Sequence, residues 1–348
     1  MIEYMPWSQE VADKCLRDYE KGIFSILDIE LGGQCNYHCI YCDSPCREKV
    51  CDVSYDNLEK AFLTGNIRWV FICGLGEPTA TGNKKVLLHI LQLCERYNAR
   101  CSIFTNLSNL STELIEYIDK GILYLLFKYD SRDIVKNMNL YGVSHVNKQL
   151  FNIDRIKKHV IIKNGCTNLA ASIVPTKVNK EDILDIVRDC LSNNIYPLIA
   201  ELENSGDAQD YYSQLALSDE ELLHIKEQVN ELVGETYKVP VCPAVISGVH
   251  VRHDGRVTVD EYTGLSCHWF WLQEPKTKVV GDFNEMTMEE IVMRIDSIRA
   301  DRFAKVQSLQ KDAKNKVFGG CGGDVNVLLH QYITSALRRK KLNDIFGL

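Results

Sequence analysis

Hydrophobic positions change their spacing repeatedly between about residue 24 and residue 203. Short, nearly continuous apolar runs alternate with stretches in which apolar residues recur every three or four positions. The first pattern is typical of buried strands and the second of amphipathic helices. Together they predict a parallel sheet covered by helices, an α/β fold. The predicted strands cover residues 25–31, 68–73, 100–105, 122–129, 168–174 and 197–203.

The pattern changes beyond about residue 235, where short strands and turns replace the alternation. Ser218 and Glu221 have the spacing of a capping box, which predicts a helix leading out of the α/β part. Asp254 and Gly255 predict a hairpin turn between two strands. The expected division is an N-terminal extension (1–23), an α/β domain (24–217), a connecting helix (218–240) and a small C-terminal α+β domain (241–348).

Composition narrows the function classes. The chain has 348 residues, of which 45% are hydrophobic and 25% charged, typical of a globular protein. Its first ten residues, MIEYMPWSQE, lack a secretory signal, and no apolar run is long enough for a membrane span, so we expect a cytoplasmic protein. The net charge of −7 argues against nucleic acid as a partner. Fourteen cysteines in a reducing compartment suit metal clusters better than disulfides.

Cys35, Cys39 and Cys42 form a CxxxCxxC triplet, with Tyr41 directly before the last cysteine. Three thiolates can hold three irons of a [4Fe–4S] cluster and leave the fourth iron for another ligand. A structural zinc site, a disulfide framework and reactive loop thiols are the alternatives. A zinc set built on Cys39, Cys42 and Cys46 is among them.

A second motif, GLGEP, directly follows the predicted strand 68–73. Glycine lets the backbone approach a ligand closely, and carbonyl and carboxylate oxygens can accept hydrogen bonds from an ammonium group. About thirty residues separate this motif from the triplet. Its residues are Gly74, Leu75, Gly76, Glu77 and Pro78.

The two motifs resemble the radical S-adenosylmethionine (radical SAM) superfamily, in which the second is usually written GGEP. The resemblance implies a partial (β/α)6 TIM-type barrel and a [4Fe–4S] cluster whose unique iron is chelated by SAM. It also implies that an electron from a flavodoxin or ferredoxin cleaves SAM to methionine and a 5′-deoxyadenosyl radical, which removes a hydrogen atom from carbon. Leu75 in place of a glycine is a departure from the family motif.

By the same resemblance, polar residues at strand ends would contact SAM or the substrate. Asn106 and Ser131 could equally be helix-cap or turn residues. The cofactor-binding candidates are Tyr41, Gly74, Gly76, Glu77, Pro78, Thr105, Asn106, Lys128, Ser131 and Ser172. The catalytic candidates are Asp130, Glu201 and Glu203, the last two expected on one face of the strand 197–203.

The C-terminal hairpin and its cysteines resemble the SPASM and twitch domains of radical SAM proteins. The resemblance implies one auxiliary [4Fe–4S] cluster on Cys242, Cys267 and Cys321, with Asp260 or His268 among the candidates for the fourth ligand. Asp260 stands where such domains usually have a cysteine. The alternative is a hairpin cap that holds zinc or no metal.

The sequence therefore predicts a radical SAM enzyme, of oxidoreductase or epimerase type, acting on a peptide or another natural-product precursor. A small-metabolite substrate, such as a sugar, aminoglycoside or nucleoside, is the alternative within the same class. A non-catalytic iron–sulfur or zinc protein that binds a partner or senses redox state is the alternative from another class.

Overall fold

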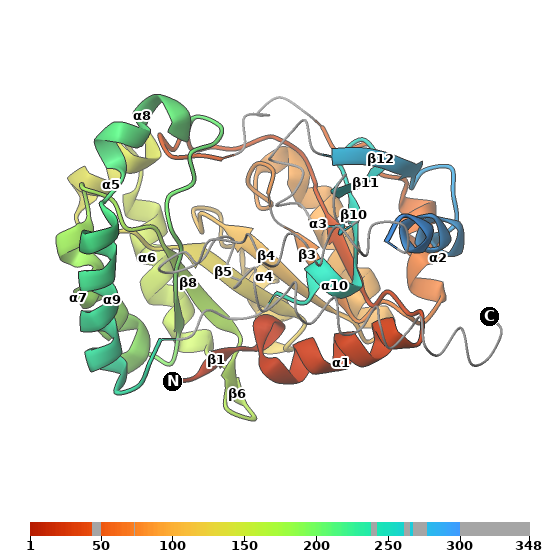
Figure 1. Ribbon diagram of the computed structural model, residues 1–348, viewed down its shortest axis with the longest axis horizontal. Coiled ribbons are helices and arrows are strands. Elements are labelled where there is room, and N and C mark those ends of the chain that lie inside the picture. The colour runs from red at the N-terminus through yellow and green to blue at the C-terminus, as the bar shows by residue number, and fades with distance from the viewer. Residues whose placement is uncertain (44–49, 73, 238–241, 261–264, 267–276, 300–348) are drawn as a thin grey trace.

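The computed structural model describes residues 1–43, 50–72, 74–237, 242–260, 265–266 and 277–299, apart from the side chains of residues 245 and 246. Its centre is a sheet with the strand order β12-β11-β10-β2-β3-β4-β5-β8-β9 (Figure 1). Six strands run parallel in chain order: β2 (Ile26–Ile29), β3 (Trp69–Ile72), β4 (Arg100–Thr105), β5 (Leu123–Lys128), β8 (Leu169–Ile173) and β9 (Tyr196–Ile199). The predicted α/β fold with a parallel sheet is confirmed.

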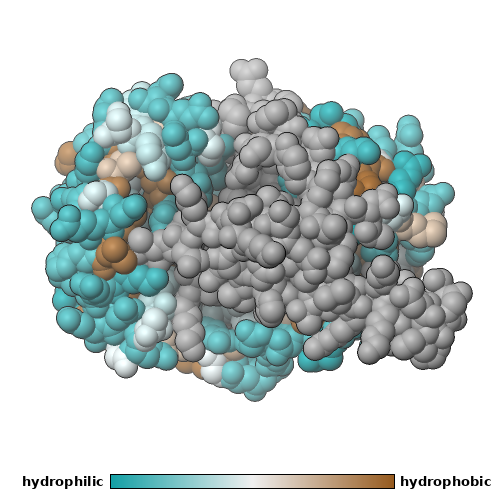
Figure 2. Space-filling model, viewed as in Figure 1, coloured by the Kyte–Doolittle hydropathy of each residue, from teal (hydrophilic) through white to brown (hydrophobic). Residues whose placement is uncertain are grey.

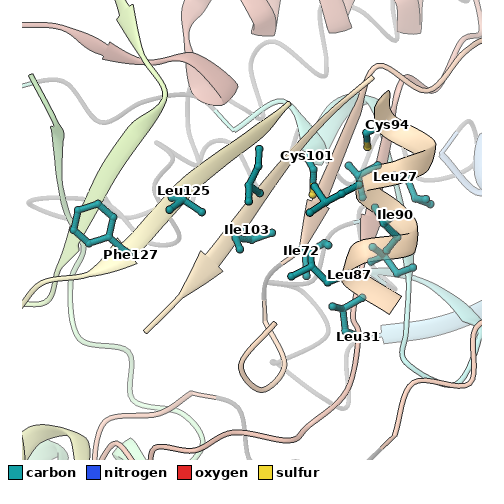
Figure 3. Close-up of a cluster of buried hydrophobic side chains, with 14 of the residues drawn as sticks. Leu27, Leu31, Ile72, Leu87, Ile90, Cys94, Cys101, Ile103, Leu125 and Phe127 are labelled. Carbon is teal, nitrogen blue, oxygen red and sulfur yellow. The ribbon is translucent and has the colours of Figure 1, made fainter. Parts of the chain in front are cut away.

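Helices cover the outer face of this sheet. They are α2 (Tyr55–Leu63), α3 (Thr81–Arg96), α4 (Thr112–Asp119), α6 (Asn147–Ile156), α7 (Ile183–Ser192) and α9 (Asp219–Val233). Figure 3 shows Leu87, Ile90 and Cys94 of α3 packed toward Leu27 and Cys101 of the strands. Burying these apolar faces on both layers is the main stabilising contribution to the fold.

Successive side chains of each strand point alternately to the outer and the inner face of the sheet. On β5, Leu125 and Phe127 belong to the outer core, whereas Tyr124 and Leu126 pack on the inner face. The period of two along a strand therefore directs Lys128 to the inner face as well.

Polar residues begin the helices where the sequence predicts. The Ser218 hydroxyl accepts from the Glu221 N–H, and the Glu221 side chain accepts from the Ser218 N–H, which completes the predicted capping box. The same reciprocal pair joins Thr287 and Glu290 before a helix over residues 288–299. These caps satisfy backbone donors that have no partner within the helix.

The predicted C-terminal hairpin extends the central sheet. It consists of β10 (Gly248–Val251) and β11 (Arg256–Asp260), joined through Gly255 at a φ of +83°, and β12 (Thr277–Asp282) follows antiparallel to β11. Because β10 pairs in parallel with β2, its carboxyl end lies at the same edge as the carboxyl ends of the six main strands.

The N-terminal segment fills the inner face at the opposite, amino edge. β1 (Glu3–Tyr4) pairs with β7 (Cys166–Thr167), η1 (Met5–Trp7) follows, and α1 (Gln9–Glu20) lies across the lower side of the molecule in Figure 1. Tyr4, Met5 and Trp7 pack against the first residues of several strands, including Trp69 and Tyr196. The sequence predicted an extension here without its position.

The remaining elements are α5 (Ile134–Tyr141), η2 (Lys157–His159), β6 (Ile162–Lys163), η3 (Lys180–Asp182), α8 (Ala208–Leu215) and α10 (Ala244–Ser247). No helix within the described ranges is both long enough and apolar enough to cross a bilayer. On the face shown in Figure 2, the coloured surface is mostly hydrophilic, and its hydrophobic residues form small, separate groups.

One strand prediction is wrong at its end. β9 stops at Ile199, so Glu201 and Glu203 do not alternate on a strand but lie in the partly exposed connection to α8. Just after β9, the Ala200 N–H donates a backbone hydrogen bond to the carbonyl of Ile173, the last residue of β8. The neighbouring strand β8 ends there, shortly before Pro175, which has no N–H to donate.

Candidate functional site

The cysteine triplet lies in the loop that follows β2, at the carboxyl edge of the parallel strands. Loops at this edge converge on one mouth in barrels of this kind. Cys35, Cys39 and Cys42 pack into one cluster of side chains with Tyr37 and Tyr141. None of the three cysteines forms a disulfide.

The C-terminal end of α5 supports one side of this loop. The N–H groups of His38 and Ile40 donate to the carbonyls of Tyr141 and Leu140, each at 3.0 Å. Gly142 follows at a φ of +62°, and a Cβ there would lie 2.3 Å from the His38 carbonyl oxygen. The approach therefore depends on glycine at this position.

The GLGEP loop supports the other side. The Glu77 N–H donates to the Gln34 carbonyl at 2.8 Å, and the Asn83 amide donates to the carbonyls of Gly32 and Glu77 at 3.0 and 2.9 Å. Gly76 has a φ of +62°, and a Cβ would lie 2.2 Å from the Gly32 oxygen. The two predicted motifs are thus in direct contact. Asn83, which joins them, carries no signal in the sequence.

The Glu77 carboxylate connects the GLGEP loop to the end of β4. It accepts hydrogen bonds from the N–H and hydroxyl of Thr79, from the Thr105 hydroxyl at 2.6 Å and from the Asn106 N–H at 2.7 Å. Burial raises the pKa of Glu77 above its ordinary value, although these four hydrogen bonds oppose the shift. Glu77 and Thr105 therefore fix the geometry of the mouth.

Asn106 ties the same strand end to the cysteine loop. Its amide donates to Asn36 at 2.9 Å, Asn36 donates to the Ser108 hydroxyl at 2.7 Å, and the Ser108 N–H returns to Asn106 at 2.9 Å. Leu107, between Asn106 and Ser108, has a φ of +59°. This left-handed backbone conformation is uncommon for a residue other than glycine, and it lets the Ser108 N–H turn back to Asn106.

Asp130 joins three elements beneath the triplet. Its carboxylate accepts from the Tyr41 hydroxyl, from the Tyr141 hydroxyl at 3.0 Å and from the Val174 N–H at 2.8 Å. Burial, reinforced by the Asp130 charge, raises the pKa of both tyrosines well above the ordinary value, so they stay hydrogen-bond donors. Asp130 therefore braces the cysteine loop against α5 and β8.

Lys128 points toward the cysteine loop from the inner face of β5. Its Nζ lies 4.4 Å from the centroid of the Tyr41 ring. Burial tends to lower the pKa of Lys128, but the nearby Cys39 and Asp130 outweigh it and raise the pKa. Burial raises the pKa of the Cys39 thiol to about 12, and Lys128 opposes that shift. Ser172 is the register partner of Lys128 on β8.

Ser131 takes part in a turn. Its hydroxyl donates to Asp182 and accepts from the Asp133 N–H at 2.9 Å, just before α5. The structure therefore brings together the cysteine triplet, GLGEP, Thr105, Asn106, Lys128 and Asp130. Glu201 and Glu203 lie in the loop after β9 instead.

Cys242 and Asp260 lie at the amino edge, away from the triplet. Cys242 is buried in the inner-face cluster that contains the N-terminal segment. His250 pairs with Thr258, which brings Asp260, at the end of β11, to the Gly248 end of β10. Cys267, His268 and Cys321 are outside the described residues.

The sequence analysis missed a row of ionisable groups on β2 and β10 and just beyond the ends of these strands. His250 Nδ1 lies 3.2 Å from Asp28, its Nε2 lies 3.5 Å from Glu30, and His253 Nδ1 lies 3.1 Å from Glu30. All four residues are buried. Asp28 and Glu30, alternating on an apolar strand, were the available signal.

The pKa values of His250 and Glu30 are shifted in opposite directions. Burial tends to lower the pKa of His250, but Asp28 and Glu30 outweigh it and raise the pKa to about 9. Burial tends to raise the pKa of Glu30, but hydrogen bonds from His250 and His253 outweigh it and lower the pKa to about 2. His250 and Glu30 are therefore an ion pair near neutral pH.

Three cysteine thiols of one loop are a donor set of the kind that binds an iron–sulfur cluster. Within the described ranges, no three histidine, cysteine, aspartate or glutamate side chains converge as ligands of one metal ion. The ligands of a [4Fe–4S] cluster bind different irons and so stand farther apart than the ligands of one ion. By residue type, Cys35, Cys39 and Cys42 are the side chains of this loop that could each bind one iron.

Solved structures share this fold. No protein-family model and no curated protein matches the sequence. Streptococcus suis SuiB bound to S-adenosylmethionine has 16% identity and a TM-score of 0.58, covering 90% of this chain and 80% of that chain. The anSMEcpe structure with bound AdoMet has 15% identity and a TM-score of 0.53, covering 93% and 98%.

The chain has the fold of SuiB and anSMEcpe, both solved with S-adenosylmethionine bound. At these identities the likeness concerns the fold, and it confirms the partial TIM-type barrel expected from the sequence. SuiB bound to its precursor peptide SuiA is also similar, with 17% identity and a TM-score of 0.54 over 84% of this chain and 71% of that chain.

Proposed function

We propose that this protein is a cytoplasmic radical SAM enzyme that modifies a carbon position of a peptide. The observation that carries the proposal is the direct contact between the cysteine loop and GLGEP, made by Glu77 and Asn83 at the carboxyl edge of the barrel. That contact joins a three-thiolate donor set to a glycine-rich loop, the two features that a cluster-bound SAM requires.

Cys35, Cys39 and Cys42 would hold the [4Fe–4S] cluster, which, with SAM at its open iron and an electron from a flavodoxin or ferredoxin, supplies a 5′-deoxyadenosyl radical. The residues of the chain orient and enclose this site. Gly76 allows close approach of the backbone, and Asp130 fixes the loop through Tyr41. At the amino edge, the buried N-terminal segment would limit the access of water to the inner face from that side.

Two solved structures with a similar fold contain bound peptides, which supports a peptide substrate. SuiB is bound to the precursor peptide SuiA in one similar structure, and anSMEcpe is bound to the Cp18Cys peptide in another, with 14% identity, a TM-score of 0.53 and coverage of 91% and 96%. The reaction class we propose is oxidation, bond formation or epimerisation at carbon. An auxiliary cluster involving Cys242 at the amino edge would receive an electron in the oxidative case.

The test is anaerobic reconstitution followed by incubation with SAM and dithionite. We expect about eight irons per chain if the auxiliary cluster is present and about four if only the triplet binds. We also expect 5′-deoxyadenosine, and its loss in a Cys35/Cys39/Cys42→Ala variant. Zinc in place of iron, without SAM cleavage, would refute the enzyme and favour the non-catalytic alternative.

A Cys46→Ala variant is the matched control for the triplet. It should keep both iron and SAM cleavage, because Cys46 is outside the CxxxCxxC set. Loss of metal in this variant would instead support a set built on Cys39, Cys42 and Cys46. The reconstituted protein is then incubated with candidate peptides or candidate sugars, and the mass of each compound is measured before and after the reaction. A mass change in a peptide supports the peptide proposal, and one in a sugar supports the small-metabolite alternative.

A further inference from the structure

Lys128 is a cation held between two aromatic rings beside the cysteine loop. Its Nζ lies 4.4 Å from the Tyr41 ring centroid, 3.4 Å from the Tyr41 hydroxyl oxygen and 5.5 Å from the Phe104 ring centroid. A cation over an aromatic face is attracted by the ring quadrupole, and more strongly where water is excluded. The ammonium group is therefore positioned by the chain itself, without a ligand.

The ring beneath this cation belongs to the cysteine loop. Tyr41 directly precedes Cys42 and lies two residues after Cys39. Its hydroxyl is bonded to Asp130, and its ring contacts Tyr141 edge-on, with a centroid distance of 6.5 Å. The ring thus has contacts on several sides, and these contacts hold the segment between the two cysteines against α5 and β5.

We propose that Lys128 is a positioning residue for the cluster loop, which holds Tyr41 in place and puts a positive charge against the ring that lies between Cys39 and Cys42 in the sequence. The inference rests on the proposed function, because it concerns the cluster that these thiolates would bind. The sequence comparison expected Lys128 to contact the SAM carboxylate or the substrate. The geometry points instead to a role that is present before SAM binds.

The charge has a consequence for electron uptake. A [4Fe–4S] cluster gains one negative charge when it accepts one electron, and nearby charge is among the factors that set its reduction potential. A positive charge held against the loop by the Tyr41 ring stabilises the reduced state relative to the oxidised state. Only the electron moves in this step, from the flavodoxin or ferredoxin class of donor, and no bond to Lys128 forms or breaks.

The experiment measures the reduction potential of the triplet cluster in the absence of SAM, by an EPR-monitored redox titration of the full chain. Lys128→Met should shift the reduction equilibrium about tenfold toward the oxidised state, which corresponds to about 59 mV for one electron. Lys128→Arg keeps the charge and should restore most of the wild-type potential. Iron content and thermal unfolding are measured for every variant.

Lys120→Met is the matched control. Lys120 Nζ lies 5.3 Å from the Tyr117 ring centroid, but Lys120 is half exposed at the C-terminal end of α4 and not at the carboxyl edge of a strand. It should leave the potential unchanged. If Lys128→Met does not bind the cluster, Lys128→Arg tests the role of the charge. A tenfold shift of the reduction equilibrium toward the oxidised state in Lys128→Arg, which keeps the charge, would overturn that role.

The outcomes separate the two proposals. A wild-type potential in Lys128→Met, with only SAM affinity reduced, overturns the positioning role and restores the direct SAM contact, while the proposed function stands. A wild-type protein that binds no iron and cleaves no SAM refutes both.

Discussion

The buried pair of His250 and Glu30 predicts a dependence of stability on pH. The raised pKa of His250 means that the folded state binds a proton more tightly than the unfolded state. This contribution is fully present below the ordinary pKa of 6.5 and is lost as the pH rises through about 9. The lowered pKa of Glu30 acts in the opposite sense, so its contribution is present above 4.5 and lost as the pH falls through about 2. Together they stabilise the fold most between pH 4.5 and 6.5.

The magnitude follows from the shift of His250. A rise from 6.5 to about 9 corresponds to about 3 kcal/mol, at about 1.4 kcal/mol for each pKa unit. His250→Gln removes this titration, so the change in unfolding free energy between about pH 6 and about pH 9.5 should be about 3 kcal/mol smaller than in the wild type. The variant should also be less stable at pH 6, because Asp28 and Glu30 stay buried without their cation.

The assay is urea unfolding of the metal-free protein at the two pH values, followed by circular dichroism. NMR titration of the histidine rings, with His250→Gln for assignment, gives the pKa directly. His159→Gln is the control, since it removes a partly exposed histidine–carboxylate pair with Asp119 at 2.8 Å. An equal pH dependence in wild type and His250→Gln, or a His250 pKa below 6.5, would refute the reasoning.

Three further variants test how the mouth is built. Gly76→Ala should lower the unfolding free energy of the metal-free protein by more than about 1–2 kcal/mol. The alanine would have to adopt a left-handed backbone conformation, and its Cβ would lie 2.2 Å from the Gly32 oxygen. An unchanged melting temperature would contradict this close approach. Asn83→Ala removes the amide bonds to the Gly32 and Glu77 carbonyls and should cost about 1–3 kcal/mol in urea unfolding, together with lower iron uptake. Normal iron uptake would show that Asn83 does not order the loop. Tyr141→Phe removes one donor to the Asp130 carboxylate and should cost about 1.5–3 kcal/mol by the same assay, and a loss below about 0.5 kcal/mol would exclude a strong bond.

Local signals in the sequence predicted the framework well. The strand expected over residues 100–105 is β4 with the same bounds, and Ser218 caps α9 as its spacing with Glu221 predicts. These features depend on neighbouring residues, whose hydrophobic period and capping chemistry are visible in the chain. The CxxxCxxC and GLGEP motifs likewise predicted loops at strand ends.

Long-range partners could not be predicted in this way. Asp28 and His250 are 222 residues apart, and only the parallel pairing of β2 with β10 brings them together. The end of β9 depends on where its neighbour β8 stops, so the strand prediction ran on to Glu203. The bonds of Asn83 and Asp130 depend on loop paths that no local pattern specifies.

Within the described residues, packed side chains close the amino edge of the inner face. Tyr4, Met5 and Trp7 fill the space among the strand beginnings, and the Tyr4 hydroxyl is fixed to Ser102 at 2.9 Å. A molecule bound on the inner face would not pass between these strand beginnings, and the carboxyl edge beside the cysteine loop is a route that leaves their packing intact. If SAM and a substrate share that route, whichever binds deeper must arrive first and leave last, so turnover would follow a compulsory order of binding and release.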